Sequence, residues 1–156
     1  GIEYADMQMI AEIYGVMRDG FGMSAPDIGT VFDRWNKGPL QSYLIEISGK
    51  VANAFHTKSQ GPLLDIIVDA AGQKGTGRWT AIEAQHLASP IPGIEAAVVA
   101  RNLSSRLQER VECEALFGAA PVTIGTEQRS IAQLDTGLIA GQILLSEHGF
   151  PVIDSA

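Results

Sequence analysis

Apolar residues recur at intervals of three and four near the start of the chain, which is the spacing of one helix face. The first stripe comprises Met7, Ile10, Tyr14 and Met17. It predicts a helix from about Ile2 to Arg18 that Asp19-Gly20 ends.

Two further helices carry local start signals. Ser24, followed by Pro26 and Asp27, is typical of a helix N-cap, a first-turn proline and an acid at the positive end of the helix dipole. Ser42 can cap the next helix in the same way. The apolar stripes that follow are Ile28, Val31, Phe32 and Trp35, ending at Asn36-Lys37-Gly38, and then Leu44, Ile47, Val51 and Phe55, followed by a loop over 56–62.

The middle of the chain is less regular. The run from Leu63 to Asp69 fits a buried strand or a helix, and we predict a helix because Asp65 and Asp69 lie four residues apart and Gly72 suits a C-terminal cap. Thr80-Ala81-Ile82-Glu83 matches a capping box and predicts a helix to about Leu87. From Gly93 to about Phe117 apolar residues cover two faces, which predicts one long central helix.

The fold class predicted is all-α, without strand pairs or internal repeats. Residues 1–117 form the expected helical core, and residues 118–156 a loop with one further helix from Ile131 to Glu147.

Composition narrows the possible partners. The chain has 156 residues, a net charge of −7, one cysteine and 19% charged residues. The acidic balance without a basic cluster argues against nucleic acid and anionic membranes, and one cysteine excludes an intrachain disulfide. So few charges favour a surface that meets a protein partner. The start lacks a methionine and a signal sequence, so we expect a segment of a longer cytoplasmic protein.

Two charged residues fall on helix faces that are otherwise apolar. Glu3 shares the face of Met7 and Ile10, where a carboxyl group could act as a general acid; the alternative is an N-terminal acid favoured by the helix dipole. Arg101 lies on nearly the same helix face as Ile94 and Val98. It therefore either forms a structural salt bridge or binds a carboxylate or phosphate as a clamp.

A glycine-rich segment, Gln73 to Trp79, places Lys74 and Thr76 between glycines. Such a loop before a helix N-terminus can bind phosphate, although a turn without a ligand is the commoner use. It matches neither the P-loop GxxxxGK(S/T) nor the dinucleotide fingerprint GxGxxG. The three histidines and Cys113 have neither metal-ligand spacing nor a catalytic neighbour, so we predict no metal site.

Four ordered motifs, GIEYADMQ, DRWNKGPLQSYLIEIS, DAAGQKGTGRWT and PIPGIEAAVVARNLSS, resemble the all-helical C-terminal domain of 6-phosphogluconate dehydrogenase. The resemblance covers about residues 1–116. It implies that Glu3 corresponds to the general acid, and that substrate is bound by Tyr4, Lys74, Thr76 and Arg101, with Tyr4, Lys74 and Arg101 at the phosphate.

The resemblance also implies a reaction of the pentose phosphate pathway. NADP takes a hydride from C3 of 6-phosphogluconate while a lysine takes the hydroxyl proton, CO₂ leaves, and the glutamate protonates C1 of the enediol to give ribulose 5-phosphate. The family's base lysine, its Rossmann domain and its C-terminal tail are not found in this sequence. The family resemblance implies that the parent enzyme is a homodimer. Because the sequence lacks those parts, we expect this chain alone neither to bind NADP nor to catalyse the reaction. A helical interaction module, or a protein whose cofactor domain is a separate polypeptide, are the alternatives.

Overall fold

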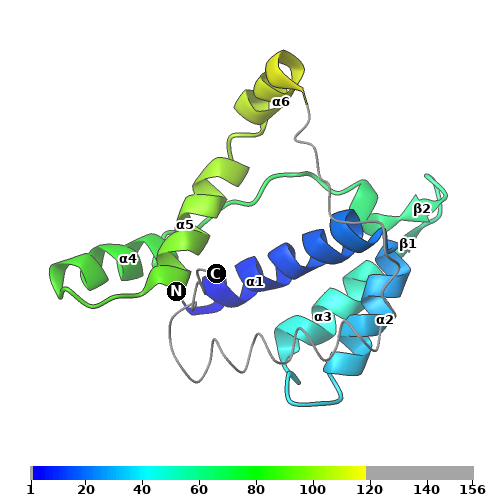
Figure 1. The fold of residues 1–156 in the computed structure, drawn as a ribbon, viewed down its shortest axis with the longest axis horizontal. Coiled ribbons are helices and arrows are strands. Elements are labelled where there is room, and N and C mark those ends of the chain that lie inside the picture. The colour runs from blue at the N-terminus through cyan, green and yellow to red at the C-terminus, as the bar shows by residue number, and fades with distance from the viewer. Residues whose placement is uncertain (1, 119–156) are drawn as a thin grey trace, which may run out of the picture. The chain divides into compact units, whose positions relative to one another are not determined.

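The computed structural model describes residues 2–118, all within one compact unit of the chain. Its elements are six α-helices, two short strands and two short turns of other helix types: α1 (Ile2–Gly15), the π-helical η1 (Val16–Gly20), α2 (Ala25–Trp35), α3 (Tyr43–Ala52), β1 (Phe55–His56), β2 (Gly61–Pro62), the 3-10 turn η2 (Leu63–Asp65), α4 (Thr76–His86), α5 (Pro92–Ser104) and α6 (Leu107–Phe117) (Figure 1). The all-α prediction is confirmed. Its one exception is the antiparallel pair β1–β2, which the sequence did not predict.

Helices α2 and α3 begin where their cap residues predict. The Ser24 hydroxyl accepts a hydrogen bond from the Asp27 amide, and the Ser42 hydroxyl accepts one from Ile45 at 3.2 Å. Each side chain thereby satisfies one of the amides that a helix start leaves unpaired. The predicted α2 stripe is buried throughout, at Ile28, Val31, Phe32 and Trp35.

The two helices pack against each other (Figure 1), and a glycine on each leaves room for a side chain from the other segment. A β-carbon added at Gly29 would overlap the Asn53 side chain, and one at Gly49 would overlap that of Asp33. Asn53 and Asp33 are themselves joined by a hydrogen bond of 3.0 Å. The predicted α3 stripe is only partly buried, since Val51 and Phe55 are exposed and Phe55 lies in β1.

Helix α1 packs against α5 as well as α3, which brings the start of the chain to residues almost a hundred positions later. A small buried cluster joins them: Tyr4 from α1, Ala97 and Val98 from α5, with Met7 packed against it. Helix α4 also packs against α5. The first turn of α1 therefore meets the start of α4 and the middle of α5 around Tyr4.

Three helix predictions in the second half are wrong in detail. Residues 63–69 form only the short η2, and residues 66–75 have no regular secondary structure. Helix α4 begins at Thr76, one turn before the predicted capping box, and the Thr80 hydroxyl donates to the Thr76 carbonyl instead of capping. The predicted long helix is two helices, α5 and α6, separated at Ser105–Arg106.

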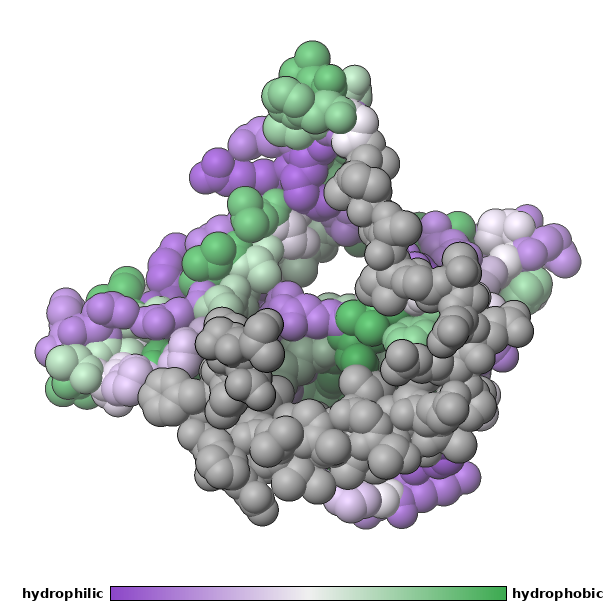
Figure 2. Space-filling model, in the orientation of Figure 1, coloured by the Kyte–Doolittle hydropathy of each residue, from purple (hydrophilic) through white to green (hydrophobic). Residues whose placement is uncertain are grey.

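The helix predicted at Ile131–Glu147 lies outside the described residues. Several apolar residues on α4, α5 and α6 are exposed, among them Trp79, Val99, Leu103, Val111, Leu116 and Phe117, and hydrophobic groups are visible on the surface in Figure 2. The second face of the predicted long helix is thus uncovered within residues 2–118. None of the helices in this part of the chain has the length and apolar character needed to span a membrane.

Candidate functional site

The guanidinium of Arg101 lies over the ring of Tyr4, with its central carbon 4.0 Å from the ring centroid. This is a cation–π contact between α5 and α1, and it is partly shielded from water because Tyr4 is buried and Arg101 half-buried. Helix spacing predicted that Arg101 faces inward, and this is confirmed. Two residues that the family resemblance assigned to substrate binding are therefore in direct contact.

Arg101 also holds the loop that carries Lys74. Its Nη1 donates a hydrogen bond of 2.6 Å to the Gly72 carbonyl, and its Nη2 contacts the sulfur of Met7 at 3.4 Å. No carboxylate among residues 2–118 forms an ion pair with Arg101. The structural salt bridge considered from sequence is absent within this range, and the charge of Arg101 is not neutralised by a described acid.

Gly77, in the first turn of α4, lies against the other partner of that contact. A β-carbon built on Gly77 would overlap the Tyr4 ring at Cδ2 and Cε2. Only glycine lets the α4 backbone approach the ring this closely. The tyrosine is thus packed between the start of α4 and the Arg101 guanidinium.

The start of α4 presents unpaired backbone amides. Its N-cap residue is Gly75, with a left-handed φ of 110° that favours glycine, and no side chain caps the first turn. The amides of that turn and the positive end of the helix dipole suit an anion. Lys74 and Thr76 flank Gly75, and both are exposed.

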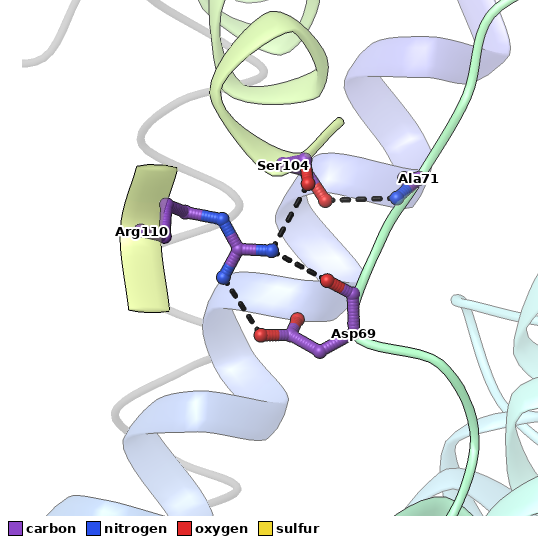
Figure 3. Close-up of polar contacts among 4 residues, drawn as sticks. All are labelled: Asp69, Ala71, Ser104 and Arg110. Carbon is purple, nitrogen blue, oxygen red and sulfur yellow. Dashed lines mark hydrogen bonds and ion pairs between the residues drawn. The ribbon is translucent and has the colours of Figure 1, made fainter. Parts of the chain in front are cut away.

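A set of polar contacts, which we term the loop tether, joins residues 69–73 to α5 and α6. The Ala71 amide donates to the Ser104 hydroxyl at 2.9 Å, and Gln73 donates to Asn102 at 2.5 Å. Arg110 binds the Asp69 carboxylate at 2.7 Å and its carbonyl (Figure 3). Together with the Arg101–Gly72 bond, these contacts fix the segment that precedes Lys74.

No sequence pattern indicated the residues of the loop tether. Their partners lie 29 to 41 positions apart along the chain, so no local pattern pairs them. The available signal was indirect: the last turn of α5 carries three polar residues, Arg101, Asn102 and Ser104, after an apolar stretch.

Glu3 does not have the environment that its stripe predicts. It is exposed, although it lies in the first turn of α1 next to buried Tyr4. The apolar stripe is half-buried farther along the helix, at Met7, Ile10 and Tyr14, whereas Glu3 is uncovered, which fits the alternative of an N-terminal acid. Residues 2–118 contain no cluster of histidine, cysteine or acidic side chains that could hold a metal ion.

These features define an all-helical domain in which the Arg101 guanidinium lies near the uncapped start of α4, with Lys74 in the adjoining loop. Arg101, Lys74 and the α4 amides are donors without acceptor side chains among the described residues, apart from the bonds given above. Such a group of donors can bind phosphate or carboxylate.

Comparison with known proteins identifies the domain. A family model described as the C-terminal domain of 6-phosphogluconate dehydrogenase matches residues 1–156. The chain is 43% identical to "6-phosphogluconate dehydrogenase, decarboxylating" of Schizosaccharomyces pombe, over 100% of the chain and 32% of that protein. It is 39% identical to the NADP(+)-dependent, decarboxylating enzyme of Bacillus subtilis, over 100% of the chain and 34% of that protein.

A solved structure agrees. The 6-phosphogluconate dehydrogenase of Plasmodium falciparum, studied in apo form and in complexes with NADP+ and 6-phosphogluconate, superposes with a TM-score of 0.82 at 35% identity, covering 92% of this chain and 30% of that one. The chain belongs to the 6-phosphogluconate dehydrogenase C-terminal domain family, which confirms the resemblance. It spans about a third of the length of the relatives it matches.

Proposed function

We propose that this chain supplies the phosphate-binding part of the substrate site in an NADP-dependent, decarboxylating 6-phosphogluconate dehydrogenase of the pentose phosphate pathway. Arg101, Lys74 and Tyr4 bind the substrate phosphate, Thr76 makes a further contact with the substrate, and Glu3 acts as the general acid. The supporting relatives carry that enzyme name.

One observation carries the proposal: the Arg101–Tyr4 contact at 4.0 Å, together with the bond from Arg101 to the Gly72 carbonyl. Through them, residues from α1, the glycine loop and α5 meet at one place. A phosphate there would meet the remaining Arg101 donors, the Lys74 ammonium and the amides of the first α4 turn. Charge-assisted hydrogen bonds of this kind are stronger than neutral ones.

The positions of these groups fit the substrate chemistry. Holding the phosphate by several donors would fix the distance from that end of the substrate to the carbon that reacts. Glu3 lies one residue from Tyr4 and is exposed, so its carboxyl group is open to a substrate held at the Tyr4 ring. In the enzyme reaction it would donate the proton that C1 of the enediol takes up after CO₂ leaves.

We assign NADP to a Rossmann domain of the parent enzyme, because no GxGxxG motif occurs in this sequence. The exposed apolar residues of α4, α5 and α6 would suit contacts with that domain and with a second subunit of a cytoplasmic homodimer. The alternative, a helical interaction module without catalysis, would use the same surfaces but needs no phosphate affinity.

Calorimetric titration distinguishes the two functions. We expect the chain to bind 6-phosphogluconate more tightly than gluconate, which lacks the phosphate. K74A should weaken 6-phosphogluconate binding by about tenfold, whereas the control K58A, which removes another exposed loop lysine, should not. Equal affinity for gluconate, or equal losses in both variants, would favour the interaction module.

A further inference from the structure

We propose that Arg110 is a positioning residue for the substrate site, because it fixes the backbone of the loop that presents Lys74. Arg110 lies on α6 and is outside the set of residues assigned to the substrate. The inference rests on the proposed function for its ligand, but its structural part can be tested without one.

Three hydrogen bonds define the role of Arg110. Its Nη1 donates to the Asp69 carboxylate at 2.7 Å, and its Nη2 donates to the Asp69 and Ser104 carbonyls (Figure 3). Two of the three acceptors are therefore main-chain atoms. A fork-shaped guanidinium that binds carbonyls of two segments sets the distance between their backbones.

The break between α5 and α6 makes this arrangement possible. In a continuous helix, the Ser104 carbonyl would accept from the amide four residues later. Here the chain turns at Ser105–Arg106, and the Ser104 carbonyl accepts from Arg110 instead, at 3.0 Å. The Ser104 hydroxyl accepts from the Ala71 amide, so Ser104 joins Arg110 to the loop at a second point.

Burial indicates that stability alone does not explain Arg110. Its partner Asp69 has 79% of its side chain exposed, and exposed ion pairs contribute little to folding. Arg110 itself is half-buried, and its Nε is buried without a partner among the described residues, which is unfavourable. What the side chain provides is a fixed geometry for the loop.

The consequence for the site follows from chain order. Residues 66–75 have no regular structure of their own, so external contacts decide where the loop lies. The loop tether holds Asp69, Ala71 and Gln73, the Arg101 bond holds Gly72, and Lys74 comes next. Loss of the Arg110 contacts would release Asp69, the first residue that the loop tether holds. The positions of Lys74 and Gly75 would then be less well fixed.

Hydrogen exchange of the unliganded chain tests the structural part. We expect R110A and R110K to speed exchange of the Ala71 amide by about tenfold while amides of α2 and α3 are unchanged. R110K keeps the charge and the aliphatic stem but cannot bind both carbonyls as a fork, and it serves if R110A does not fold. The control R106A removes an exposed arginine whose side chain, among residues 2–118, pairs with Glu109. Equal exchange of Ala71 in R110K and R106A would overturn the proposal.

Binding of 6-phosphogluconate tests the functional part. R110K should weaken it by about fivefold, and the double variant K74A/R110K should bind within about twofold of K74A, because Arg110 acts through Lys74. Losses that simply add would contradict this route. If the unsubstituted chain does not bind 6-phosphogluconate, the proposed function fails, whereas the Ala71 exchange still decides whether Arg110 holds the loop.

Discussion

Gly77 lies against the ring of Tyr4 so closely that no β-carbon fits between the α4 backbone and the ring. This contact joins the start of α4 to α1, and Arg101 covers the same ring from α5. The position of the glycine loop relative to the first helix is therefore set by the absence of a side chain at residue 77.

G77A tests this contact. We expect it to reduce the free energy of unfolding by about 1–3 kcal/mol, because the added methyl group must displace a buried ring. The matched control is G15A: Gly15 has helical dihedral angles and no atom within 4 Å of its added β-carbon. The control should raise stability by about 0.4–1 kcal/mol. Urea unfolding of both variants measures the difference, and equal effects would rule out close packing at Gly77.

Helix capping gives a second comparison. S42A removes a side-chain cap of α3 and should cost about 1 kcal/mol of unfolding free energy. T80A removes a hydroxyl that, in the described part of the chain, bonds to the Thr76 carbonyl within α4, and it should change stability by less than about 0.5 kcal/mol. A larger loss in T80A than in S42A, measured by urea unfolding, would support the capping box that the sequence predicted.

The observed helix boundaries show which elements a sequence can predict. The starts of α2 and α3 were predicted because Ser24 and Ser42 bond to amides three residues away, and such signals are local. The end of α5 was not predicted, because apolar spacing continues through Ser105 and Arg106. At that end, the Ser104 carbonyl accepts a hydrogen bond from Arg110, a side chain of the next helix, α6.

The candidate site shows the same difference between local signals, which a sequence reveals, and contacts between distant residues, which it does not. The inward position of Arg101 follows from helix periodicity, and the glycines and Lys74 predict a loop that can bind an anion. The irregular path of residues 66–75 depends on Ser104 and Arg110, which periodicity in the loop cannot indicate. The exposure of Glu3 agrees with the alternative of an N-terminal acid favoured by the helix dipole, because helix spacing identifies a face but does not show which of its residues are covered.

The titration of Tyr14 gives a prediction about pH. Partial burial and, secondarily, the Asp65 carboxylate raise the pKa of the Tyr14 phenol above its ordinary value of 10.0. A raised pKa in the folded state means that this contribution to stability is complete below pH 10.0 and is lost as the pH rises through the folded-state pKa.

Phenolate absorbance can isolate this group as the difference between the unsubstituted chain and Y14F. We expect the difference to titrate above pH 10.0, and D65N to move it to lower pH because one negative charge is removed. A midpoint at or below 10.0, or no response to D65N, would contradict the arrangement of Tyr14 and Asp65.

The chain alone should not reduce NADP in the presence of 6-phosphogluconate. It spans about a third of the length of its relatives and has no dinucleotide fingerprint. The absorbance of NADPH measures this directly, with a complete family member as the positive control. Turnover by the chain would show that it contains a cofactor site.

We propose that the substrate phosphate binds at Tyr4, Arg101 and the start of α4. Amide spectra of the isotope-labelled chain, titrated with 6-phosphogluconate and separately with gluconate, test it most directly. We predict saturable shifts of the Gly75, Thr76 and Gly77 amides with 6-phosphogluconate, weaker shifts with gluconate, and none in α2. Unchanged α4 amides, or the same shifts with both compounds, would contradict the claim.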